Sequence, residues 1–258
     1  MSNPFAARRA AFRALHAEGC FALPNPWDAG SAKRLAKLGF KALASTSAGA
    51  AWAMGKDDGQ ITRDEVIEHL RMLCAATDLP VNADFENGFS DTAEGVGESV
   101  TRAIEAGVSG LSIEDWSGSA LYELPVAVER LKAARAAIDA SGQDVILVGR
   151  TEGYLRGIRD LAPTLERLKA YAEAGADCLY APAVTDPEEI KAIVAAVAPK
   201  PVNVLFWGPE MSVESLGALG VRRVSTGGSL AAAAWAGFDA VAKRLAEEGR
   251  LAPAGGAI

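Results

Sequence analysis

Carboxylate side chains follow three separate apolar stretches of the sequence. Asp84 and Glu86 come directly after residues 80–83, Glu114 ends the run 109–114, and Arg150 and Glu152 end the run 145–152. Residues two apart on a strand face the same side, so Asp84 and Glu86 are predicted to point together. Converging acids with little compensating lysine need a cation, and such oxygen ligands suit Mg²⁺, with Mn²⁺ as the alternative.

These residues belong to a regular alternation of apolar and amphipathic segments. Eight short apolar segments are predicted strands, at 21–24, 41–46, 80–85, 109–114, 144–150, 177–182, 201–206 and 222–226. Segments with apolar residues at helical spacing follow them, at 29–38, 63–76, 93–106, 125–140, 160–174, 187–197, 213–219 and 230–247. Alternating strands and helices predict a parallel sheet with the helices outside it.

The number of repeating units predicts the architecture. Eight βα units in about 230 residues match the size of a (β/α)8 TIM barrel. An open doubly wound sheet is the alternative, but no GxGxxG motif follows the first strand. We therefore predict one α/β domain over residues 1–258, a (β/α)8 TIM barrel, with a leading helix at 3–17 and a loose tail at 252–258. Active sites of such barrels lie at the carboxyl ends of the strands.

Composition limits the partners of the chain. The sequence has 26 Lys and Arg residues against 33 Asp and Glu residues, a net charge of −7 without a basic block, which argues against nucleic acid. No apolar stretch approaches the roughly 18 residues of a membrane span, and the N-terminus lacks the apolar core of a signal peptide. We expect a cytoplasmic protein with no membrane partner. The three cysteines are widely spaced and are predicted to be unpaired.

The predicted strand ends together suit a small carboxylate substrate, an α-keto acid. Arg150 can hold a carboxylate through two hydrogen bonds, and the short turn at 45–49 offers backbone N–H groups to an anion. A Mg²⁺ ion there would act as a Lewis acid on two substrate oxygens. The other polar residues at predicted strand ends are Asn25, Asn203 and Ser225.

Each of these residues also has a purely structural interpretation. Asp84 and Glu86 could cap the following helix or pair with lysine, and the segment Ser45–Ser47 could merely close a strand. Arg150 could form a structural ion pair with Asp84 or Glu114. The joint pattern favours a site, because four independent strand ends would have to imitate one together.

The motifs resemble the isocitrate lyase/phosphoenolpyruvate mutase superfamily over about residues 20–235. They read Asn-Pro-Trp-Asp-Ala-Gly-Ser-Ala (25–32), Gly-Lys-Asp-Asp (55–58), Asp-Phe-Glu-Asn-Gly (84–88), Ser-Ile-Glu-Asp (112–115) and Gly-Arg-Thr-Glu (149–152). The resemblance implies a Mg²⁺-binding (β/α)8 barrel that makes or breaks C–C or C–P bonds next to an α-keto acid. It also implies a homotetramer whose final helix is swapped between subunits.

The resemblance also implies roles for individual residues. The candidate metal ligands are Asp84, Glu86 and Glu114, with Glu86 standing where the family usually has Asp. The candidate catalytic residues are Arg150, Glu114, Asp58 and Glu152. The candidate substrate-binding residues are Ser45, Thr46, Ser47, Arg150 and Asn203. The family often has Ser-Gly-Leu at 45–47, so the match there is partial.

Departures from the family narrow the expected reaction. Isocitrate and methylisocitrate lyases carry a loop with a catalytic Cys after the fourth strand, whereas residues 115–124 contain no Cys, Lys or His. The loop also lacks the residues that handle a phosphoryl group. We therefore expect a carbon–carbon lyase, close to oxaloacetate decarboxylase, that forms a metal-stabilised enolate of a small α-keto (di)carboxylic acid.

Several alternatives remain open. They are a phosphonate enzyme (phosphoenolpyruvate mutase or phosphonopyruvate hydrolase), a non-catalytic keto-acid binder, and an enzyme that uses the turn at 225–229 as a phosphate cradle. Tyr122, Tyr154 and Glu152 are candidate proton donors for the lyase. Trp116 is a candidate lid over the pocket.

Overall fold

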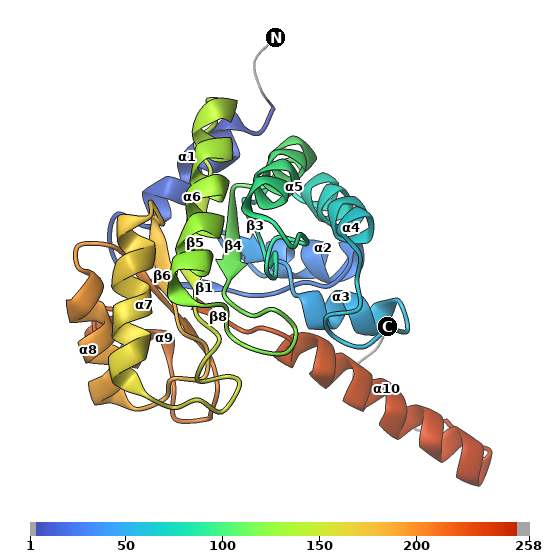
Figure 1. Ribbon diagram of the computed structural model, residues 1–258. Coiled ribbons are helices and arrows are strands. Elements are labelled where there is room, and N and C mark those ends of the chain that lie inside the picture. The colour runs from blue at the N-terminus through green and yellow to red at the C-terminus, as the bar shows by residue number, and fades with distance from the viewer. Residues whose placement is uncertain (1–3, 252–258) are drawn as a thin grey trace.

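The computed structural model describes residues 4–251 and forms a parallel eight-stranded barrel (Figure 1). The strands are β1 (Phe21–Leu23), β2 (Leu43–Ala44), β3 (Val81–Ala83), β4 (Gly110–Glu114), β5 (Ile146–Arg150), β6 (Cys178–Tyr180), β7 (Val202–Leu205) and β8 (Arg223–Ser225). They pair in sequence order from β2 to β8, and β8 pairs with β1. A hydrogen bond of 3.0 Å from the Ala44 N–H to the Pro24 carbonyl links the ends of β1 and β2. The predicted TIM barrel is confirmed.

Ten helices lie between residues 4 and 251, and most of them cover the outside of the barrel. They are α1 (Ala6–Leu15), α2 (Ala29–Lys37), α3 (Ser47–Ala53), α4 (Arg63–Ala76), α5 (Ala93–Ala106), α6 (Leu124–Ser141), α7 (Leu161–Glu173), α8 (Pro187–Val197), α9 (Val213–Ala218) and α10 (Ser229–Glu248). Local signals set their ends: Thr62 and Glu65 form a capping box at the start of α4, and Gly107 ends α5 at φ 105°. The predicted helices are confirmed within a few residues, and α3 was not predicted.

The predicted leading helix is present as α1, and it closes the amino-terminal end of the barrel. Phe12 is fully buried in a core cluster with barrel residues such as Leu23 and Val148. Arg9 donates to the carbonyls of Ile104 and Val108, at 2.7 and 2.9 Å. The first residue of the predicted helix 3–17 and the predicted tail 252–258 lie outside the described residues. This end of the molecule is therefore a packed structural base.

Helix α10 extends away from the barrel (Figure 1). Only Ala231 is buried among its residues, whereas Trp235, Phe238, Val241 and Leu245 are exposed. A helix swap between subunits would cover these side chains, and it stays a prediction. Between residues 4 and 251, no helix is both long enough and apolar enough to cross a membrane.

Candidate active site

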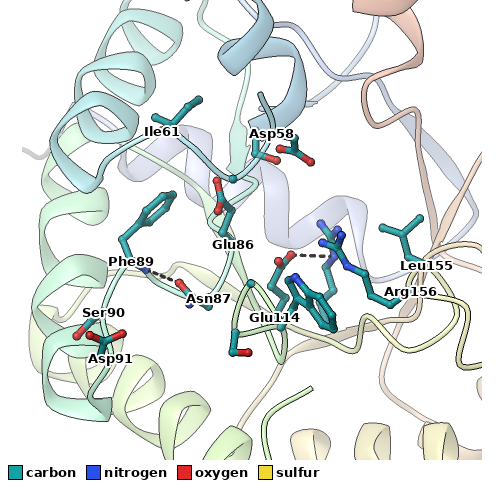
Figure 2. Close-up of a pocket in the computed structure, with 16 residues that line it drawn as sticks. Asp58, Ile61, Glu86, Asn87, Phe89, Ser90, Asp91, Glu114, Leu155 and Arg156 are labelled. Carbon is teal, nitrogen blue, oxygen red and sulfur yellow. Dashed lines mark hydrogen bonds and ion pairs between the residues drawn. The ribbon is translucent and has the colours of Figure 1, made fainter. Parts of the chain in front are cut away.

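The predicted site residues gather at the carboxyl ends of the strands, around two adjoining cavities. The outer cavity has a volume of about 550 Å³, and Ser47, Asp58, Glu86, Glu114 and Arg150 contribute to its lining (Figure 2). The inner cavity, of about 40 Å³, is lined among others by Ser45, Asp84, Arg150, Tyr180 and Asn203. Arg150 and Glu114 therefore reach the site from neighbouring strands, and Arg150 borders both cavities.

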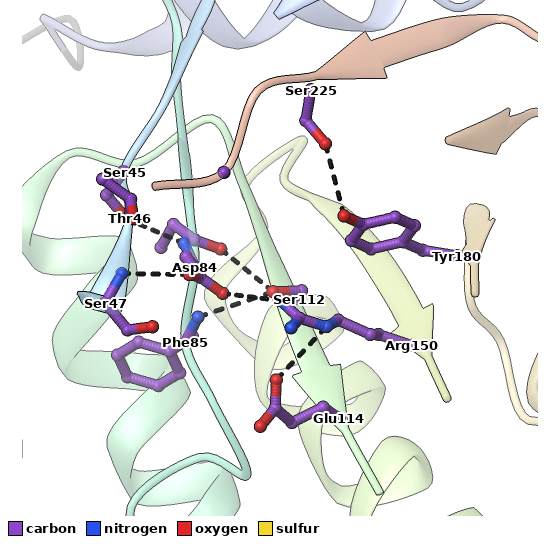
Figure 3. A network of polar contacts seen from close by, with 12 residues as sticks. Ser45, Thr46, Ser47, Asp84, Phe85, Ser112, Glu114, Arg150, Tyr180 and Ser225 are labelled. Atoms are coloured by element: carbon purple, nitrogen blue, oxygen red, sulfur yellow. Dashed lines mark hydrogen bonds and ion pairs between the residues drawn. The ribbon is translucent and has the colours of Figure 1, made fainter. Parts of the chain in front are cut away.

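Arg150 is held in place by three carboxylates (Figure 3). Its Nη1 lies 2.9 Å from Asp84 Oδ1, and its Nε lies 2.6 Å from Glu152 Oε1 and 3.3 Å from Glu114 Oε2. Burial alone would lower the pKa of Arg150, but the charges of Glu152, Glu114 and Asp84 raise it well above its usual value. Arg150 is thus a permanent cation, and the structural ion pairs considered as alternatives are present.

Asp84 connects Arg150 to the segment after β2. The backbone N–H of Asp84 donates to Ser45 Oγ at 2.8 Å, and Asp84 Oδ2 accepts the Ser47 N–H at 3.0 Å. Thr46 is the N-cap of α3, and its hydroxyl accepts the Gly49 N–H at 3.2 Å. The prediction of an open anion-binding turn at 45–49 needs correction, because the segment starts a helix and the N–H groups of Ser45, Ser47 and Gly49 are already used.

Glu86 has an unfavourable backbone conformation, and its surroundings disfavour the charged form of its carboxyl group. It lies beyond β3 with φ 43°, in the left-handed region that non-glycine residues rarely adopt. The i, i+2 strand geometry predicted for Asp84 and Glu86 is therefore wrong, because β3 ends at Ala83. Glu86 Oε1 is buried without a hydrogen-bond partner. Burial, followed by the charges of Asp84 and Asp58, raises the pKa of Glu86 to about 8.

Two further carboxyl groups of the outer cavity, those of Glu114 and Asp58, have raised pKa values. Burial is the main cause that raises the pKa of Glu114, which Arg150 opposes and Glu152 reinforces. Partial burial and the charge of Asp84 raise the pKa of Asp58, which lies at the exposed rim. Burial is the largest cause of each raised pKa, and the acidic side chains around the outer cavity outnumber the guanidinium groups of Arg150 and Arg156.

This charge imbalance fits a divalent cation. Between residues 4 and 251, no group of three or more His, Cys, Asp or Glu side chains is arranged to hold a metal ion. Mg²⁺, however, keeps several waters and often binds through only one or two carboxylates. Asp84 and Glu86 can supply these, and the buried unpartnered Oε1 of Glu86 is the atom that such an ion would satisfy. The metal role of Glu114, which is paired with Arg150, stays a prediction.

Other predicted site residues are present but do not face the outer cavity. Glu152 is fully buried behind Arg150 and lines neither cavity, so here it positions Arg150. Asn203 lies in the inner cavity, where its side chain contacts Ser225 and Arg223. Asn25 Oδ1 accepts the backbone N–H groups of residues 226 and 227, which leaves neither group for a phosphate cradle. The catalytic role of Glu152 and the binding role of Asn203 stay predictions.

The loop after β4 is a fixed hairpin. Trp116 forms an antiparallel bridge with Leu121, and the Ser117 N–H donates to the Ala120 carbonyl at 2.9 Å. At its base, buried Asp115 accepts hydrogen bonds from neighbouring side chains and the backbone; the donors are Thr151, Glu152, Arg167 and Tyr171. Trp116 lines the outer cavity, so in this conformation it is part of a wall.

The two candidate tyrosine proton donors point elsewhere. The Tyr154 hydroxyl donates to Glu189 on α8 at 2.9 Å, and the Tyr122 hydroxyl accepts from Asn87 at 3.1 Å. Neither tyrosine lines the outer or the inner cavity. A role in proton transfer for either would require a different conformation.

Sequence reasoning missed residues that the fold brings to the site. Tyr180 lies under the Arg150 guanidinium, with 5.2 Å between Cζ and the ring centroid. Its position at the end of β6 was a usable signal. Arg156 lies in the loop after β5, beyond the strand end, and its guanidinium stacks on Trp116 at 4.6 Å. Nothing in the local sequence distinguishes Arg156 from a surface arginine.

Comparison with known proteins agrees with this site. Residues 12–246 match the family model described as phosphoenolpyruvate phosphomutase. The chain belongs to the phosphoenolpyruvate phosphomutase family. This confirms the resemblance seen in the motifs. The chain is 47% identical to a protein of solved structure from Burkholderia cenocepacia J2315, which is provisionally described as a lyase or mutase. The TM-score is 0.93, and the match covers 96% of this chain and 92% of that chain.

Carbon–carbon lyases of the isocitrate lyase/phosphoenolpyruvate mutase superfamily are among the homologues of this family member. An oxaloacetate decarboxylase from Rhodopseudomonas palustris (strain BisB18) is 31% identical, over 90% of this chain and 83% of the relative. The 2-methylisocitrate lyase of Escherichia coli (strain K12) is 31% identical, over 77% of this chain and 70% of the relative. The comparisons thus support an enzyme of the carbon–carbon lyase type.

Proposed function

We propose that the protein is a Mg²⁺-dependent lyase or decarboxylase. It cleaves the C–C bond next to the keto group of a small α-keto (di)carboxylic acid. One observation carries the proposal: a permanently charged Arg150 lies among carboxylates that exceed the available cations, beside the unpartnered oxygen of Glu86. Such a site attracts a divalent cation on its acidic side and a substrate carboxylate at the arginine.

The residues of the chain divide the work of binding and orientation. Arg150, buried and fixed by Glu152, presents a guanidinium to the substrate carboxylate. Asp84 is oriented by Ser45 and by the Ser47 N–H, so its carboxylate is placed before substrate enters. A bound Mg²⁺ would supply Lewis-acid stabilisation where negative charge develops on the keto oxygen.

Proton return needs an acid that faces the outer cavity. Glu114 lines this cavity and has a raised pKa, chiefly because it is buried. A carboxyl with a raised pKa keeps its proton to a higher pH than an ordinary glutamate does, and it can release that proton to a carbanion. We therefore assign proton return to Glu114, either directly or through a water.

A phosphonate enzyme is the second candidate, because the matching family model is that of a phosphomutase. The fixed hairpin after β4 argues against it, since residues 115–124 contain no Lys or His to contact a phosphoryl group. Cleavage of a C–P bond would release inorganic phosphate or transfer the phosphoryl group. A phosphate assay separates this class from the lyases.

The proposal is tested by keto-acid release from a panel of oxaloacetate, alkylated malates, methylisocitrate and phosphonopyruvate. Each is assayed with Mg²⁺ and with a chelator, and the pyruvate and phosphate that form are measured side by side. We expect metal-dependent pyruvate without phosphate from oxaloacetate, the α-keto dicarboxylic acid of the panel; pyruvate from a malate or from methylisocitrate instead would show a C–C lyase of a hydroxy acid. Phosphate release would place the protein among the phosphonate enzymes, and binding of Mg²⁺ without any turnover would support a non-catalytic binder.

A further inference from the structure

The outer cavity has a second guanidinium that the proposed chemistry does not use. Arg156, in the loop after β5, lines this cavity together with Trp116 from the loop after β4. Figure 2 shows Arg156 and Leu155 on one side of the cavity, with Phe89 and Asp91 on the other. Arg156 therefore marks a positive side of a cavity whose remaining charged residues are mostly acidic.

Among residues 4–251, the Arg156 guanidinium contacts two side chains without forming a hydrogen bond. Its Nη2 lies 3.2 Å from Glu152 Oε2, yet that oxygen has no hydrogen-bond partner, so the attraction is electrostatic only. The face of the guanidinium stacks on Trp116, with 4.6 Å between Cζ and the ring centroid. Stacking fixes the plane of a guanidinium and leaves its edge available to a planar acceptor.

The residues that contact Arg156 and Trp116 are themselves held in place by hydrogen bonds and ion pairs. Trp116 belongs to the hairpin that the Leu121 bridge and buried Asp115 hold in place, and Glu152 is itself fixed by Arg150. A fixed, stacked guanidinium with free N–H groups is suited to a carboxylate, which it can bind through two parallel hydrogen bonds. An ion pair with Glu152 alone would not require the guanidinium of Arg156 to stack on Trp116.

We propose that Arg156, stacked on Trp116, binds a second carboxylate at the far end of the substrate, so that the enzyme selects α-keto dicarboxylates over monocarboxylates. This rests on the proposed function, because Arg150 must hold the keto-acid end. The cavity of about 550 Å³ has the volume of about 18 waters at roughly 30 Å³ each, more than a three-carbon acid needs. Leu155 and Phe89 supply apolar surface for the carbon chain between the two ends.

The test compares three probes by calorimetry with Mg²⁺ present. Oxalate occupies only the keto-acid end, whereas 2-oxoglutarate and 2-oxopentanoate differ only by a terminal carboxylate in place of a methyl group. We expect the wild-type protein to bind 2-oxoglutarate at least ~10-fold more tightly than 2-oxopentanoate, as a charge-assisted bidentate contact implies. Arg156→Leu should remove this preference and change the Kd of oxalate less than twofold.

Two further variants separate recognition from structure. Arg156→Gln should behave as Arg156→Leu does, whereas Arg159→Leu, which removes an exposed arginine of the same loop, should behave as the wild type. Equal binding of both keto acids by the wild type would overturn the proposal. So would a loss of oxalate binding in Arg156→Leu that equals the loss for 2-oxoglutarate. If the wild type fails to bind oxalate at all, the proposed function fails, and this inference fails with it.

Discussion

Replacement of Glu86 by Gln tests whether the buried Glu86 carboxylate destabilises the folded protein when no cation is bound beside it. The pKa of Glu86 is raised from an ordinary value of 4.5 to about 8 in the folded, metal-free protein. The unfolded chain therefore releases this proton at lower pH than the folded chain does. Linkage then requires that stability falls as pH rises from about 4.5 towards about 8. Glu86→Gln removes the titrating proton with almost no change in volume.

The size of the effect follows from the raised pKa. At 1.36 kcal/mol per pKa unit, and discounted for partial exposure of the side chain, Glu86 costs the folded state about 3 kcal/mol between pH 5 and pH 8. For a chain of this size, 1 kcal/mol shifts Tm by about 2–4 °C. In EDTA, wild-type protein should thus lose about 6–12 °C more than Glu86→Gln does over this pH interval.

Thermal unfolding followed by circular dichroism measures this difference. Glu105→Gln, an exposed glutamate on α5, is the matched control and should follow the wild type. Added Mg²⁺ should raise the Tm of the wild type more than that of Glu86→Gln, because the ion replaces the missing charge. Equal pH dependence of wild type and Glu86→Gln in EDTA would refute the account of Glu86.

Three further predictions concern the rest of the molecule. Asp84→Asn should lower metal-dependent turnover by at least ~100-fold and leave the circular dichroism spectrum unchanged, because it removes one negative charge from the metal site and from the Arg150 ion pair with almost no change in volume. Asp115→Ala should destabilise the protein by about 3 kcal/mol in urea unfolding, because Arg167 loses its buried partner; no loss would show that the hairpin is held otherwise. The helix α10 carries the exposed apolar side chains Phe238 and Leu245, and its removal should reduce the assembly size measured by light scattering. An unchanged size would contradict a role for α10 in assembly.

Strand and helix periodicity was sufficient to predict the barrel. The apolar segments and their helical partners each occur in the expected order, because the buried faces of a parallel barrel leave a regular pattern. Helix α3 was missed because Ser47–Ala53 is short and rich in small residues, which reads equally well as a turn. Its N-cap, Thr46, was visible in the sequence, but the first residues of α3 were interpreted as an anion-binding turn.

The part of the site that lies at the ends of the strands could be predicted from the sequence. Asp84, Glu114 and Arg150 meet because consecutive strands of a barrel are neighbours. The left-handed backbone of Glu86 and the stacking of Arg156 on Trp116 depend on loop geometry. Loop geometry follows from contacts such as those of Asp115, which join residues far apart in the sequence.

Proton exchange at carbon 3 of pyruvate is the measurement that tests the central claim most directly. The enzyme is incubated with pyruvate in deuterated buffer, with Mg²⁺ or with EDTA, and the methyl signal is followed by NMR. If the site stabilises the enolate of an α-keto acid, deuterium enters the methyl group with Mg²⁺, and neither EDTA nor Asp84→Asn allows it. Exchange no faster than in buffer alone, with Mg²⁺ and pyruvate shown to bind, would contradict the account.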